Sequence, residues 1–105
     1  MKIIYLTEMA NLSSDRTGLP YDIWLDSSGN GRNTSHNLPR LKIDIEGDKI
    51  PVSISKEPKI LVKRKEIPKF RLFKKFMILN YENLIRHWNL EIDDEYLKRN
   101  IKKVD

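Results

Sequence analysis

The stretch SHNLPRLKIDIEGDKIPVSIS, residues 35–55, carries the clearest strand pattern in the sequence. Apolar and polar residues alternate over residues 40–46 and again over residues 49–55. Such alternation is typical of strands that bury one face, and residues 46–48 between the two runs are typical of a tight turn. The stretch therefore predicts an antiparallel hairpin. Its expected inward residues are Leu41, Ile43 and Ile45 on the first strand and Ile50, Val52 and Ile54 on the second.

The residues before this hairpin predict further strands joined by loops. Residues 21–26 alternate in the same way, with the odd-numbered side chains pointing inward, and residues 2–6 form a short apolar run. Residues 10–20 and 27–39 have the composition of loops. The second of these has thirteen residues, against roughly two to five in an ordinary hairpin, and such long loops are usually functional or disordered. Pro51 predicts that its strand lies at an edge or beside a bulge.

After the strands, the apolar period changes to that of a helix. From Pro68 to Trp88, apolar residues recur at spacings of three and four, and Pro68 suits the first helical turn. The predicted core stripe consists of Phe70, Phe73, Met77, Tyr81, Leu84 and Trp88. A second helix is expected from Asp93 to Val104, because its acidic start and basic end match the helix dipole.

Strands followed by helices indicate an α+β fold. We predict a small antiparallel sheet of three to five strands packed on one long C-terminal helix, followed by a short helix. A brief apolar run at residues 60–62 is a candidate for a further strand. The whole chain, residues 1–105, is expected to form a single domain.

The composition excludes several classes of protein. None of the 105 residues is cysteine, which rules out disulfides, thiolate nucleophiles and cysteine-based metal sites. The opening MKIIYLTEMA has too short an apolar run for a signal peptide, and no stretch approaches the roughly 18–20 apolar residues of a membrane span. We therefore expect a soluble cytosolic protein with no membrane partner, and neither a metal nor a cofactor.

The positive charge is concentrated in one segment. The net charge is +5, but residues 56–75 contain nine basic and two acidic residues, so this segment carries +7 and the rest −2. Bases at the start of a helix oppose its dipole, by up to about 1 kcal/mol each. A phosphate backbone would account for them, and the alternative is a solvated lysine-rich surface. The candidate contacts to nucleic acid are Arg40, Lys42, Lys63, Arg64, Lys65, Lys69 and Arg71.

Several other polar residues are candidates for chemistry. Trp24 shares a predicted sheet face with Arg40 and Lys42, where it either stacks on a base or shields the sheet beneath salt bridges. A Mg²⁺ site for a nuclease is a further possibility, although the spacing matches no nuclease signature; its ligands would be Asp22, Asp26, Asp44 and Glu46. His36, in the long loop, is the candidate general acid or base, whereas His87 near the helix end is expected to be structural.

The long helix also carries a second apolar patch, opposite its core stripe, formed by Leu72, Phe76 and Leu79. A helix that packs on a sheet is normally polar on that side. Either the C-terminal segment covers the patch through Leu97 and Ile101, or another chain does, as a cognate protein or a second copy. The patch is therefore a candidate partner interface.

Part of the sequence resembles a known family. The residues are His36-Asn37-Leu38-Pro39-Arg40-Leu41-Lys42, the alternating strands that follow, and a helix that ends in NYENLIRHW, residues 80–88. Over residues 26–88 they resemble the small bacterial domain of unknown function 4160 family. The resemblance implies a short sheet with a helix, and a gene beside that of a second small protein in pairs that look like toxin–antitoxin modules.

The chain departs from that family at one functional position. Where the family has two histidines in an Asn-Pro-Pro-His-Phe-His stretch, this chain has Arg40 and Lys42. Any metal binding or acid–base work by those histidines is therefore not expected here. Both versions can still bind anions, because imidazolium, lysine and arginine all donate to phosphate.

These patterns together predict binding rather than catalysis. The leading hypothesis is a nucleic-acid-binding component of a toxin–antitoxin, mobile-element or phage system. The alternative is a protein-interaction module, an antitoxin or an inhibitor of a defence enzyme, that meets an acidic partner. A third hypothesis is a small metal-independent nuclease that uses His36 with Arg40 and Lys42.

Overall fold

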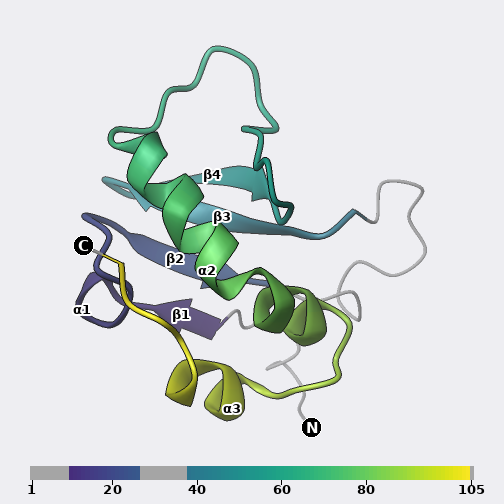
Figure 1. The fold of residues 1–105 in the computed structure, drawn as a ribbon. Coiled ribbons are helices and arrows are strands. Elements are labelled where there is room, and N and C mark those ends of the chain that lie inside the picture. The colour runs from purple at the N-terminus through teal and green to yellow at the C-terminus, as the bar shows by residue number, and fades with distance from the viewer. Residues whose placement is uncertain (1–9, 27–37, 105) are drawn as a thin grey trace, which may run out of the picture.

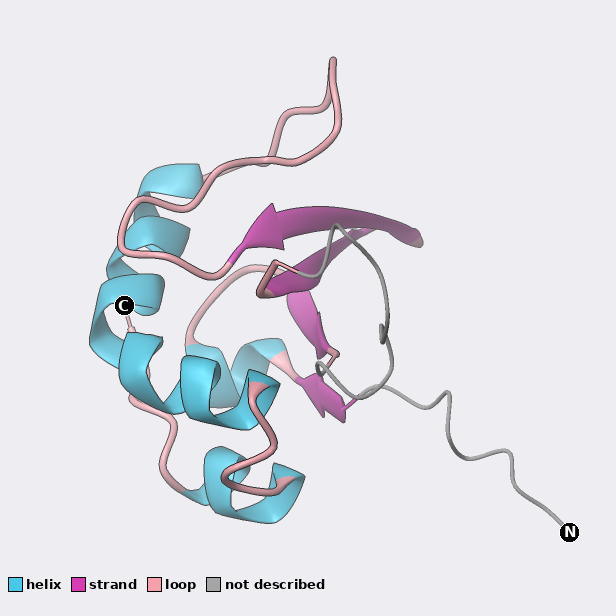
Figure 2. Ribbon diagram, turned by 90° about the vertical axis from the view of Figure 1, so that its right-hand side faces the viewer, coloured by secondary structure: helices cyan, strands magenta, loops and turns pink. Residues whose placement is uncertain are grey.

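The computed structural model describes residues 10–26 and 38–104, and it has the predicted α+β architecture (Figure 1). Its strands are β1 (Ala10–Leu12), β2 (Asp22–Leu25), β3 (Arg40–Ile45) and β4 (Asp48–Ser53). Its helices are α1 (Ser14–Thr17), α2 (Phe70–Trp88) and α3 (Asp94–Arg99). The strands form one antiparallel sheet in the order β1-β2-β3-β4, and α2 lies along one face of that sheet (Figure 2).

The hairpin of β3 and β4 forms as predicted, except that Asp48, expected in the turn, is the first residue of β4, which ends at Ser53 instead of Ser55. Ile45 pairs with Asp48, so Glu46 and Gly47 make a two-residue turn in which both have positive φ, 52° and 89°. Positive φ at both positions defines a type I′ turn, whose twist matches that of the flanking strands. The Gly47 amide donates to the Asp44 carboxylate at 2.8 Å and holds the turn.

The inner face of the sheet consists of apolar rows that cross the strands. The longer row spans all four strands and comprises Leu12, Ile23, Ile43 and Ile50. The neighbouring row comprises Leu25, Leu41 and Val52. All seven side chains are buried, which stabilises the register because a slip of one residue would turn them to solvent. Of the predicted inward residues in the hairpin, Ile45 alone is half-buried, at the end of its strand.

β4 lies at an edge of the described sheet, as Pro51 predicts. The chain that follows covers part of this edge. The Leu61 amide donates to the Pro51 carbonyl at 2.9 Å, and the Ser53 amide donates to the Lys59 carbonyl at 3.0 Å. The strand predicted at residues 60–62 is therefore reduced to a single bridge between Val52 and Ile60.

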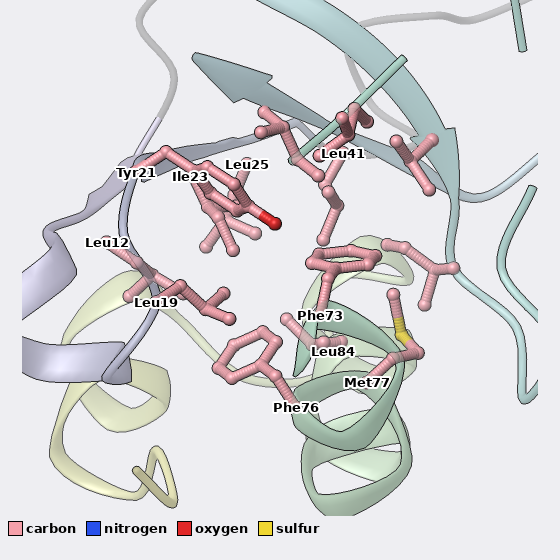
Figure 3. Close-up of a cluster of buried hydrophobic side chains, with 14 of the residues drawn as sticks. Leu12, Leu19, Tyr21, Ile23, Leu25, Leu41, Phe73, Phe76, Met77 and Leu84 are labelled. Atoms are coloured by element: carbon pink, nitrogen blue, oxygen red, sulfur yellow. The ribbon is translucent and has the colours of Figure 1, made fainter. Parts of the chain in front are cut away.

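α2 supplies the other half of the core (Figure 3). The predicted stripe faces the sheet, with Phe73, Met77, Leu84 and Trp88 buried and Phe70 and Tyr81 half-buried. The predicted start of the helix is wrong, because α2 begins at Phe70 and Pro68 stands before it. Lys69 has a left-handed backbone (φ 54°, ψ 40°), which the right-handed helix cannot pass through.

Residues 10–20 are not the plain loop that their composition predicts, since they contain β1 and α1. The start of α1 is capped from outside the segment: the Ser14 amide donates to the Asp22 carboxylate at 3.0 Å. Its end is closed by Gly18, whose φ is 86° and whose amide donates to the Ser14 carbonyl. A cap that comes from another strand leaves no local signal in the sequence.

The second predicted helix is shorter than expected. Asp93 caps it by accepting the Tyr96 amide at 2.8 Å, as the acidic start predicts, but α3 ends at Arg99. The following tail, residues 101–104, returns along α2. Buried Asn80 holds it through two hydrogen bonds with the Lys102 backbone, from Asn80 Nδ2 to the carbonyl at 3.0 Å and from the amide to Asn80 Oδ1 at 2.8 Å.

The C-terminal tail and α3 cover part of the second apolar patch. Phe76 is fully buried in the cluster that also contains Leu97 and Val104, so at this residue the structure favours the first of the two alternatives, cover by the C-terminal segment. Leu72 is half-buried against that cluster, and Leu79 remains 46% exposed. The strand predicted at residues 2–6 lies outside the described residues, as does nearly all of the long predicted loop.

Candidate nucleic-acid interface

The segment between β4 and α2 crosses one end of the molecule, above the sheet in Figures 1 and 2. It is anchored at both ends: the Lys59 amide donates to Ser53 Oγ at 2.9 Å, and Ile67 is buried in the core. Between these anchors, residues 61–66 are exposed. Lys63, Arg64 and Lys65 lie there, and Arg64 has a left-handed backbone (φ 63°) within a turn.

The segment leads directly into the start of α2, where further cations follow. Lys69 and Arg71 are exposed, and the first turn of α2 contains no acidic residue. The amides of Leu72 and Phe73 both donate to the Lys69 carbonyl, so the two amides before them have no acceptor within the helix. We call Lys63, Arg64, Lys65, Lys69 and Arg71 the basic end.

Tyr21 of the sheet fixes the backbone at this helix start. Its hydroxyl donates to the Pro68 carbonyl at 2.9 Å, and its ring is buried among core residues (Figure 3). Burial raises the pKa of Tyr21 to about 12, since the apolar surroundings disfavour the phenolate. The left-handed Lys69 is thereby held by a tertiary contact rather than by a local cap.

The charges of the basic end are largely uncompensated. Lys65 forms an ion pair with Asp48 at 2.7 Å, in which both side chains are about half exposed. Within residues 10–26 and 38–104, the other four cations form no ion pair. An exposed pair contributes little, about 0–1 kcal/mol, so the segment keeps a net positive charge, with Glu66 as the one acidic residue among residues 63–71.

Arg40 and Lys42 do not join this cluster. They alternate with the buried Leu41 and Ile43, so they lie on the sheet face that turns away from α2. Both are half-buried, and Lys42 lies between Trp24 and Pro51 in the register. The seven predicted contacts therefore form two separate groups rather than one surface.

Trp24 is held in place on that second face. Its indole Nε1 donates to the Asp44 carboxylate at 3.1 Å, and the Lys49 ammonium lies 4.8 Å from the centre of its ring. Hydrogen bonds from the Trp24 indole and the Gly47 amide lower the pKa of Asp44. This arrangement favours the structural interpretation of Trp24, as a ring that shields the sheet, over base stacking.

Two of the predicted Mg²⁺ ligands, Asp22 and Asp44, take structural roles, and so does His87. Asp22 caps α1 and Asp44 holds a turn, and no group of three metal-ligating residues occurs among the described residues. His87 is buried, with Nε2 2.6 Å from the Asp94 carboxylate, which joins the end of α2 to the start of α3. The candidate acid–base residue His36 lies outside the described residues.

Sequence reasoning missed Tyr21 and Asp48, which position the basic end. Tyr21 was expected only as an inward-facing core residue, although a buried tyrosine hydroxyl usually has a hydrogen-bond partner. The partner lies 47 residues away in the chain, and no local pattern identifies it. Asp48 was expected only as a turn residue.

Comparisons with protein families, curated proteins and solved structures found no match to this chain. The resemblance to the domain of unknown function 4160 family therefore stays a prediction. None of the helices in the described part of the chain is long and apolar enough to span a membrane.

Proposed function

We propose that this chain binds the phosphate backbone of a nucleic acid through its basic end, as a cytosolic component of a toxin–antitoxin, mobile-element or phage system. The observation that carries the proposal is the start of α2, which has exposed cations and no acid where an isolated helix favours acids. The biological context rests on the family resemblance alone.

The helix start and its cations suit phosphate for a physical reason. Amides without an intrahelical acceptor and the positive end of the helix dipole attract an anion, and Lys69 and Arg71 add full charges beside them. Each of these cations opposes the dipole in the free protein by up to about 1 kcal/mol. A bound phosphate would remove that penalty, because it is attracted by the dipole and the cations together.

The aromatic residues favour backbone contact on a duplex over stacking on single-stranded bases. Phe70, beside the basic end, stacks on Phe73 with ring centres 5.5 Å apart, and the Lys74 ammonium lies 5.7 Å from its ring centre. Trp24 is on the other face of the sheet. Proteins that bind single strands usually present exposed aromatic platforms, whereas phosphate contacts need only cations and amides.

The test is fluorescence anisotropy with labelled duplexes and single strands of DNA and RNA at two salt concentrations. If four or five phosphates are neutralised, affinity should fall roughly 10²–10³-fold between about 50 and 200 mM salt. The variant Lys63→Ala/Arg64→Ala should reduce the slope of log K against log salt by about two. Its matched control is Arg99→Ala/Lys102→Ala, which removes the same charge from exposed positions at the other end of the chain.

Two results would overturn the proposal. One is an absence of binding to every duplex at low salt. The other is equal weakening by the variant and its control, which would reduce the effect to net charge and leave the basic end without a specific role.

A further inference from the structure

A shallow hollow of about 370 Å³ lies between the solvent face of α2 and the C-terminal tail. It is lined by Lys75, Ile78, Leu79, Lys103 and Val104. Ile78 is 62% exposed and Leu79 46% exposed, so the floor of the hollow presents apolar surface to solvent. Its volume is at the small end of the range for ligand sites and has room for one or two side chains.

The wall made by the tail is fixed before any partner arrives. The Val104 amide donates to the Thr17 carbonyl at 2.8 Å, and Asn80 holds the Lys102 backbone from the other side. The Val104 side chain is 5% exposed and packs in the core cluster. A preformed hollow binds with a smaller loss of conformational entropy than one that must order on binding.

The charges around the hollow identify the kind of partner. Lys75 and Lys103 flank the apolar floor, and Arg71 and Lys74 precede it on α2, whose single acidic residue is Glu82. A second copy of this chain would bring the same lysines to the interface, which is unfavourable. A nucleic acid would satisfy the lysines but leave the apolar floor open to water.

We propose that this hollow docks a short acidic segment of a partner protein. One apolar side chain of the segment packs against Ile78 and Leu79, and its neighbouring carboxylates pair with Lys75 and Lys103. Apolar contact supplies the affinity, and charge complementarity supplies orientation and selects against basic segments. The residues that line the hollow lie outside the basic end, and the docking is a different binding activity from the one proposed above.

The experiment uses peptides from a random display library, selected on the full chain and counter-selected on Ile78→Glu. Ile78 is exposed, so this substitution leaves the core intact, and Leu90→Glu is a matched control at a leucine that is 63% exposed. Enriched peptides should combine an apolar residue with flanking Asp or Glu. Their affinity, measured by anisotropy, should fall about tenfold or more in Ile78→Glu and in Lys75→Glu/Lys103→Glu, and stay unchanged in Leu90→Glu.

Other outcomes overturn the proposal. One is that no peptide survives counter-selection, and another is that the survivors carry no excess of acidic residues. Sedimentation analysis covers the remaining case: if the parent chain self-associates and Ile78→Glu abolishes this, the occupant is a second copy. The variant Lys63→Ala/Arg64→Ala must bind the selected peptides as the parent does, so failure of the nucleic-acid proposal is recorded separately.

Discussion

Replacing Gly18 by alanine should destabilise the protein much more than the same change at Gly47. The two glycines have nearly the same left-handed backbone, with φ of 86° and 89°. For alanine this conformation is unfavourable by about 1–2 kcal/mol, and this part of the effect is common to both positions. They differ in their surroundings. A Cβ at Gly47 meets no atom within 4 Å, whereas one at Gly18 would overlap the Val104 carbonyl oxygen.

The size of the difference follows from what the overlap displaces. The Val104 carbonyl belongs to the backbone, so the whole tail must move to make room for the Cβ. This movement breaks the hydrogen bond from the Val104 amide to the Thr17 carbonyl and exposes the Val104 side chain. These losses are about 0.5–1.5 and 1.5–3 kcal/mol respectively. Gly18→Ala should therefore lower the free energy of unfolding by about 2–4.5 kcal/mol more than Gly47→Ala.

Urea denaturation followed by circular dichroism measures both variants under identical conditions. Equal destabilisation of the two, within about 0.5 kcal/mol, would refute the reasoning, because it would mean that the tail does not rest on Gly18. The peptide affinity of Gly18→Ala adds an independent readout. Val104 and Lys103 form one wall of the hollow, so displacement of the tail should weaken peptide binding as well.

Three further predictions concern single side chains. Asn80→Ala should lower the free energy of unfolding by about 2–4 kcal/mol in urea denaturation, because the Lys102 backbone loses both partners; an effect under about 0.5 kcal/mol would contradict this. Phe76→Ala should cost about 3–5 kcal/mol in the same assay, as expected of a core residue, whereas an exposed interface residue would leave stability nearly unchanged. Burial raises the pKa of Tyr21 to about 12, so the unfolded chain ionises first near pH 10, and stability should be full below pH 10 and fall as pH rises toward 12. The Tyr21→Phe variant should have a free energy of unfolding about 1 kcal/mol lower at pH 7, because it lacks the hydrogen bond to Pro68. It should also lack the part of the stability loss above pH 10 that comes from Tyr21, as measured by thermal melts at several pH values.

Strands β2, β3 and β4 were predictable because their signals are local, whereas β1 lies in a segment with the composition of a loop. The alternation of residues 40–46 and 49–55, with turn residues at 46–48, predicts both strands and the position of the turn within one short stretch. The missing elements depend on distant partners. α1 is capped by Asp22, and the left-handed Lys69 is held by Tyr21 of β2, so neither leaves a pattern at its own position.

The candidate site residues were likewise predicted where the signal is local and missed where it depends on distant contacts. Lys63, Arg64, Lys65, Lys69 and Arg71 were predicted as a cluster because they are close in sequence. The predicted set also contains Arg40 and Lys42, although alternation places these two opposite the inward residues and therefore away from the helix. The hollow was missed because the tail returns through a buried asparagine, Asn80; an asparagine near the core stripe of a helix was the one available signal.

The way α2 begins connects stability to the proposed function. Helices are usually stabilised at this position by a capping side chain and early acids, and α2 has neither. Its start is instead held by the Tyr21 hydroxyl on the Pro68 carbonyl, the buried Ile67 and the buried Phe73. Because these tertiary contacts fix the helix start, the exposed side chains of its first turn, Lys69 and Arg71 among them, do not have to stabilise it. Cations that would destabilise a helix held only by local contacts can therefore occupy this position. They lie at the end of the helix dipole that is unfavourable for positive charge, and this is the reason to expect an anionic partner.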